Sequence, residues 1–139
     1  MAENKTRPTQ MAVADFIAAI PDPVRRADAE TVCAMLARVS GEPPVMWGPS
    51  IVGFGAYEYP CGKRTEHWAR IGFSPRAKEL VLYLLPGYEG KEAQLATLGR
   101  HRLGKSCLYI KSLADVDMQV LESLAVDALA WMDEKYPKA

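Results

Sequence analysis

The residues best suited to chemistry in this chain lie in a basic loop between two glycines, GRHRLGKS, at positions 99–106. The loop matches the phosphate-binding pattern GxxxxGKS/T, in which backbone N–H groups and a lysine hold the phosphates of a nucleotide. That chemistry needs a strand before the loop and a helix after it, because the helix N-terminus supplies amides to the phosphates. Here a helical pattern precedes the loop and an apolar strand pattern follows it. We therefore do not expect a nucleotide site, and two interpretations stay open: a modest anion site and a solvated basic loop.

Nucleophiles and metal ligands are sparse in the sequence. His67 and His101 are the only histidines, whereas a catalytic zinc site usually takes three protein ligands. The three cysteines are widely spaced and form no CxxC pair, and no histidine is placed by the sequence beside one of them. Asp115, Asp117 and Glu122, near the start of the last helix, are weak candidates for a hard cation such as iron. No catalytic set is evident, and we expect neither an enzyme nor a resident cofactor.

A second group of candidates is aromatic and basic, and it is spread over the middle of the chain. Tyrosine, tryptophan and arginine can stack on a flat ligand and hold an anionic group. The predicted ligand-binding residues are Trp47, Tyr57, Trp68, Arg70, Tyr83, Lys105 and Tyr109.

The elements that must position these residues follow from hydrophobic periodicity. After a disordered polar arm at 1–9, a single domain is expected over 10–136, with the element order ααβββαβα. Asp22 and Pro23 suit the start of the second helix, and Gly41 its end. The expected strands lie at 51–59, 68–73, 80–85 and 106–111, and a short helix is expected at 89–98. Hairpin-length links predict an α+β fold with a mostly antiparallel four-stranded sheet and helices packed on one face. The helix closing the chain has a capping-box spacing at Ser112 and Asp115.

Alternation along these strands separates two faces of the sheet. One face is aliphatic or phenylalanine throughout and suits the helix layer; it is Val52, Phe54, Ala56, Ala69, Ile71, Phe73, Leu80, Leu82, Leu84, Leu108 and Ile110. The other face mixes the aromatic candidates with Gly53, Gly55 and Gly72. A hollow lined by glycine, tyrosine and tryptophan would suit a small planar or anionic ligand. Two alternatives stay open: the face is a homodimer interface, or the loop of Trp47 covers it.

Composition narrows the range of partners. Seventeen basic and seventeen acidic residues cancel, and a nucleic-acid-binding protein usually carries a basic excess. The polar start has no apolar segment of a signal peptide, and no apolar run approaches the ~20 residues of a membrane span. We therefore expect no nucleic-acid partner, no membrane partner and a cytoplasmic protein.

Four blocks of the sequence together resemble a known family. They are MWGPSIVGFG at 46–55, GFSPR at 72–76, LYL at 82–84 and the segment 99–110. In this order they resemble the YdhG-like family of small bacterial proteins, a domain of unknown function, over roughly residues 10–130. The resemblance implies a frataxin-like architecture and raises iron chaperoning as a role, but it implies no catalytic residues. The chain departs from the family at 66–69, where EHWA replaces an acidic-Trp-Pro stretch.

Three functions are thus compatible with the sequence. The leading prediction is a domain that binds a small ligand and has no evident catalytic activity. The alternatives are a frataxin-like intracellular iron chaperone and a structural or oligomerisation module that uses the glycine and aromatic face of the sheet.

Overall fold

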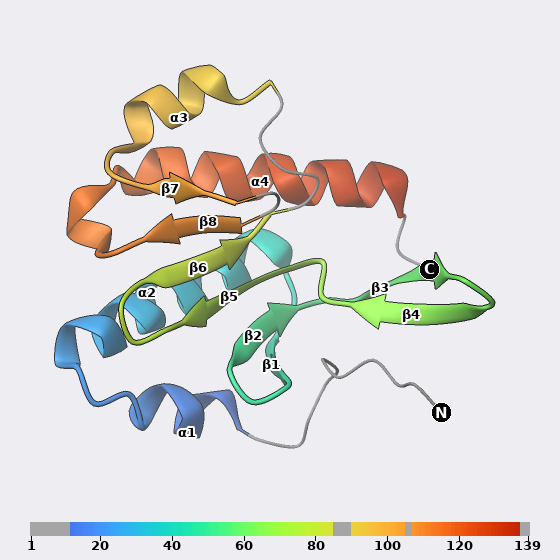
Figure 1. The fold of residues 1–139 in the computed structure, drawn as a ribbon, viewed down its shortest axis with the longest axis horizontal. Helices are drawn as coiled ribbons and strands as arrows, with labels where there is room; N and C mark the ends of the chain where they lie inside the picture. Colours follow the sequence, from blue (N-terminus) through green and yellow to red (C-terminus); the bar gives the residue numbers. More distant parts are fainter. Residues whose placement is uncertain (1–11, 85–89, 105–106, 137–139) are drawn as a thin grey trace.

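The computed structural model describes residues 12–84, 90–104 and 107–136. It is an α+β fold in which four helices accompany an antiparallel sheet (Figure 1). The helices are α1 (Val13–Ala18), α2 (Pro23–Ser40), α3 (Glu92–Leu98) and α4 (Met118–Lys135), with a short 3-10 helix η1 (Leu113–Asp115) before α4. The strands are β1 (Pro44–Trp47), β2 (Ile51–Phe54), β3 (Tyr57–Cys61), β4 (Arg64–Trp68), β5 (Ile71–Pro75), β6 (Leu80–Tyr83), β7 (Arg102–Leu103) and β8 (Cys107–Ile110).

The main sheet has six strands in the order β1-β2-β5-β6-β8-β7, so the prediction of four strands is wrong. Two short edge strands were missed. The first expected strand began at residue 51, but Pro44 already opens the edge strand β1, and the first residue of an edge strand tolerates proline. The second missed strand, β7, lies inside the basic loop and pairs antiparallel with β8.

The expected strand 51–59 is two strands, because the chain breaks at Gly55. Gly55 has φ 70°, a left-handed conformation that ends β2 before β3 begins. The returning chain breaks at the same level, since Ala69 and Arg70 lie between β4 and β5. The outcome is a separate two-stranded hairpin, β3–β4, which projects beyond the main sheet (Figure 1).

The helix ends are largely as predicted. The side chain of Asp22 accepts a hydrogen bond from the backbone N–H of Val24 at the start of α2, and Gly41 ends α2 with φ 70°. The predicted cap of the last helix is wrong in its position. Ser112 caps the 3-10 helix, and Asp117 caps α4 by accepting from two backbone N–H groups.

The core lies between the helix layer and the predicted aliphatic face of the sheet. Figure 1 shows α2 and α4 along the same face of the sheet, and both supply residues to one buried cluster. Residues of β2, β5, β6 and β8 that meet this layer are all fully or almost fully buried: Val52, Phe54, Ile71, Phe73, Leu80, Leu82, Leu108 and Ile110. The alternation assigned to these four strands is therefore confirmed. Within the described residues, no helix combines the length and apolarity that a membrane span requires.

Candidate functional site

The outer face of the sheet, opposite the helix layer, is where most of the predicted ligand-binding residues belong. Strand pairing puts Gly53 opposite Gly72, Gly72 opposite Tyr83, and Tyr83 opposite Cys107. The next row places Val81 opposite Tyr109. These neighbours share one face because facing residues in paired strands point to the same side of a sheet.

The space above Gly53 is already filled. Trp47 is only 2% exposed, and a methyl group added at Gly53 would come within 2.6 Å of the Trp47 Nε1 atom and of the Ala69 Cβ atom. Ala69 therefore lies on this outer face, whereas the alternation had predicted that it would lie on the helix face; that prediction is wrong. At this end of the sheet, the expected hollow is covered by the indole of Trp47.

Trp68 connects that covered end to the open part of the outer face. Its ring meets the Trp47 ring edge-on at 5.7 Å between centroids and the Tyr83 ring at 5.9 Å, with 90° between the planes of Trp68 and Tyr83. Such edge-to-face contacts fix the orientation of the rings. Trp68 and Tyr83 are both partly exposed, so they present aromatic surface beside the buried Trp47.

Two arginines outside the set predicted from the sequence, Arg76 and Arg102, contact Tyr83 and Tyr109 of this face. Arg76 donates a hydrogen bond from Nη2 to the Tyr83 hydroxyl at 3.3 Å, and this contact raises the pKa of the Arg76 guanidinium. The guanidinium of Arg102 lies 3.9 Å from the centroid of the Tyr109 ring and donates to Glu79 Oε1 at 2.6 Å. We call Trp68, Arg76, Tyr83, Arg102 and Tyr109 the tyrosine–arginine patch.

The two arginines differ in their electrostatic surroundings. Arg102 is neutralised by Glu79, but none of the ion pairs among the described residues includes Arg76. Arg76 is exposed at the turn between β5 and β6. It therefore offers a positive charge and several N–H donors beside the aromatic rings.

Arg70 and Tyr57 lie away from this patch. The Arg70 side chain is 3% exposed, and its Nη2 donates to Asp133 Oδ1 at 2.8 Å and to the Tyr136 carbonyl at 2.7 Å. Tyr57 packs on Tyr136 with 4.6 Å between ring centroids. Burial, with smaller effects of Tyr136 and Tyr59, raises the pKa of Tyr57 to about 12. Both residues thus attach the hairpin to the end of α4. The break at residues 69–70 interrupts the alternation that had placed Arg70 on the outer face.

The remaining predicted candidates are not assembled into a site by the described residues. Lys105 lies outside them. Asp117 is occupied as the cap of α4, Glu122 pairs with Arg38, and the carbonyl of Asp115 accepts from the backbone N–H of Arg100. In the part of the chain that the structure describes, no three His, Cys, Asp or Glu side chains are grouped to hold a metal ion. Iron binding stays a prediction.

The basic loop at 99–106 has the element order expected from its sequence. The helix α3 precedes it, β8 follows it, and β7 lies within it. A strand therefore stands where a nucleotide-binding loop would have its helix. Within the described part of the loop, Arg102 contributes to the outer face, whereas the Nδ1 atom of His101 lies 2.7 Å from the Gly99 carbonyl.

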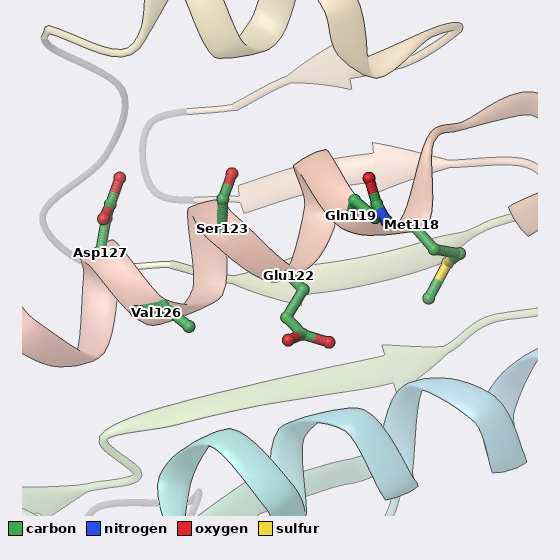
Figure 2. Close-up of a pocket in the computed structure, with 6 residues that line it drawn as sticks. All are labelled: Met118, Gln119, Glu122, Ser123, Val126 and Asp127. Atoms are coloured by element: carbon green, nitrogen blue, oxygen red, sulfur yellow. The ribbon is translucent and has the colours of Figure 1, made fainter.

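An open groove of about 520 Å³ runs along α4 on the helix side of the molecule (Figure 2). It is lined by Met118, Gln119, Glu122, Ser123, Val126 and Asp127. Its two carboxylates are already paired, Glu122 with Arg38 and Asp127 with Lys91 at 2.9 Å. The hydrogen bond from Lys91 lowers the pKa of Asp127. Because both carboxylates of the groove are paired, the groove is a weaker candidate for binding a charged ligand than the surface around Arg76.

Comparisons of the chain with protein-family models, with curated proteins and with solved structures gave no match. The resemblance to the YdhG-like family and the role that it implies remain predictions from the sequence.

Proposed function

We propose that this chain is a small-ligand-binding domain whose tyrosine–arginine patch takes a flat ligand with an anionic group. The observation that carries the proposal is the position of Arg76, which bonds the Tyr83 hydroxyl at 3.3 Å and has no carboxylate partner among the described residues. A phenol hydroxyl does not neutralise a guanidinium, so an anion that reached Arg76 would form a charge-assisted hydrogen bond.

The aromatic residues of the patch supply the other half of the recognition. Trp68 and Tyr83 are held at 90° by their mutual contact, and partly exposed rings fixed in this way add contact area at low entropic cost. Tyr109 does not offer its ring face to the ligand in the same way, because the guanidinium of Arg102 already covers that face. A flat ligand would therefore contact Trp68 and Tyr83 and direct its anionic group toward Arg76.

The test compares benzoate with benzamide, which has the same ring without the charge. Amide and indole N–H signals of the labelled full-length protein would be followed by two-dimensional NMR during each titration. Benzoate is expected to shift the Trp68 indole signal and the backbone signals of Tyr83 and Cys107, and benzamide is expected to bind more weakly. A hydrogen bond to a charged group contributes about 1.5–3 kcal/mol, so Arg76→Gln should weaken benzoate binding by about tenfold or more.

Arg38→Gln is the matched control. This variant also removes one positive charge from the protein. The charge is removed on the helix side of the molecule, where Arg38 pairs with Glu122. Its benzoate affinity should equal that of the unaltered protein. An equal loss of benzoate affinity in both variants would show that the effect depends only on the overall charge of the protein. If benzoate shifted neither the Trp68 nor the Tyr83 signals, the proposed location would be wrong.

A further inference from the structure

Two arginines reach neighbouring tyrosines of the outer face from different turns. Tyr83 of β6 stands opposite Cys107 of β8, and Tyr109 follows two residues later, so the two tyrosines are diagonal neighbours. Such neighbours lie roughly 7–8 Å apart, within reach of long side chains. Arg76 bonds the Tyr83 hydroxyl, and Arg102 lies over the Tyr109 ring. The two guanidiniums are therefore held over adjacent strands of one face.

The side chain of Arg76 lies along β6. Arg76 belongs to the turn before this strand, whereas the Tyr83 hydroxyl that it bonds belongs to the last residue of the strand. Between them, Val81 points to the outer face opposite Tyr109 and is 0% exposed, although the helix-side core cluster does not include it. The hydrogen bond to Tyr83 raises the pKa of Arg76, and a smaller electrostatic effect of Tyr109 acts in the same direction. Arg76 thus lies close to both tyrosines.

The bond of Arg102 to Glu79 is one that a stronger partner can replace. The Arg102 side chain is 63% exposed, and ion pairs exposed to water are weak. The Tyr109 ring also holds the guanidinium, and Gly104 packs against the edge of that ring, because a methyl group at Gly104 would lie 3.1 Å from the Tyr109 Cε2 atom. Arg102 can therefore release Glu79 without leaving the patch.

We propose that the anionic group bound at the tyrosine–arginine patch is a phosphate monoester, held by Arg76 and Arg102 together after Arg102 has released Glu79. This inference rests on the proposed function, since the flat ring of the ligand still contacts Trp68 and Tyr83. A phosphate monoester carries a charge of about −1.5 to −2 at pH 7 and three acceptor oxygens. Two guanidinium forks match it in charge and in donors, whereas a carboxylate carries a single charge that one guanidinium neutralises.

Three probes with the same ring test the charge and the shape of the anionic group. Benzoate is a flat monoanion, phenyl sulfate is a tetrahedral monoanion, and phenyl phosphate is a tetrahedral dianion. Two-dimensional NMR titrations of the full-length protein at pH 7.5 would follow the indole signal of Trp68 and the Nε–H signal of Arg102. Phenyl phosphate is expected to shift both signals and to bind more tightly than either monoanion by about tenfold or more, because it adds a second charged partner.

Variants of the exchanging ion pair test the part of Arg102. Arg102→Gln should lower the affinity for phenyl phosphate to that for phenyl sulfate, so the preference for the dianion disappears. Glu79→Gln frees Arg102 and should increase this preference. Arg38→Gln is the matched control, because Arg38 is 62% exposed and pairs with one carboxylate on the helix side, as Arg102 does on the outer face. The control should keep the full preference for phenyl phosphate.

The two proposals fail in different ways. If all three probes shifted Trp68 and Tyr83 with equal affinity, the phosphate inference would be overturned and the patch would remain a site for a ring with any anion. A preference for phenyl phosphate that survives Arg102→Gln would likewise overturn the inference. If none of the probes shifted Trp68 or Tyr83, the proposed function itself would be wrong.

Discussion

Adding a single methyl group at Gly53 should test how tightly Trp47 covers the outer face of the sheet. The Cβ atom of an alanine at this position would lie 2.6 Å from the Trp47 Nε1 atom and 2.6 Å from the Ala69 Cβ atom. Carbon atoms pack at about 3.5–4.0 Å, so the indole or the backbone must move by about 1 Å. Because Trp47 is 2% exposed and meets Trp68 at 5.7 Å between centroids, the indole has little room to move.

Two effects of opposite sign determine how much Gly53→Ala changes the free energy of unfolding. Overpacking a filled site costs about 1–3 kcal/mol. Replacing a strand glycine by alanine returns about 0.5–1 kcal/mol, because glycine loses more backbone freedom on folding. We expect Gly53→Ala to lower the free energy of unfolding by about 1 kcal/mol, because the midpoints of these two ranges are about 2 and about 0.75 kcal/mol.

Urea unfolding followed by circular dichroism measures this free energy, and a double-mutant cycle with Trp47→Leu identifies its cause. Leucine is smaller than the indole and leaves space for the added methyl group. The effect of Gly53→Ala should therefore shrink by about 1 kcal/mol or more in the Trp47→Leu background, because residues in contact are not additive. A Gly53→Ala variant as stable as the unaltered protein, or strict additivity in the cycle, would refute the packing of Trp47 over Gly53.

Two further predictions concern the attachment of the hairpin to α4. The pKa of Tyr57 is raised from its ordinary value of 10 to about 12, so the unfolded chain releases this proton first, and the protein should lose stability as pH rises from 10 to 12. Tyr57→Phe should make that loss smaller, as measured by urea unfolding at both pH values, and an unchanged pH dependence would contradict the raised pKa. Arg70→Gln removes a buried guanidinium that bonds Asp133 and the Tyr136 carbonyl, and it should lower the free energy of unfolding by about 1.5–3 kcal/mol, because hydrogen bonds to charged groups contribute in this range. Asp133→Asn should cost less, since the Asp133 side chain is 57% exposed and is solvated in both states; a larger loss for Asp133→Asn than for Arg70→Gln would contradict this view.

The helix layer and the buried face of the sheet could be predicted because each is encoded by local pattern. The caps of α2 at Asp22 and Gly41 are single-residue signals, and the structure confirms both. The aliphatic residues of β2, β5, β6 and β8 alternate without interruption, so their common burial followed from period-two spacing alone.

The alternation failed where the backbone leaves the strand conformation. Gly55 has φ 70°, and the chain bends between β4 and β5 at Ala69 and Arg70. A side chain beyond such a break can face either side, and nothing in the sequence fixes which. Arg70 consequently lies against α4, whereas Ala69 lies against Gly53.

The arginines of the candidate site could not be chosen from periodicity. Arg76 lies in the turn after β5, and Arg102 lies in an edge strand of two residues. Arg76 is brought to Tyr83 by the pairing of β5 with β6, and Arg102 is brought to Tyr109 by the pairing of β7 with β8. The sequence showed basic residues in both loops, but only the sheet order shows that they converge on one face.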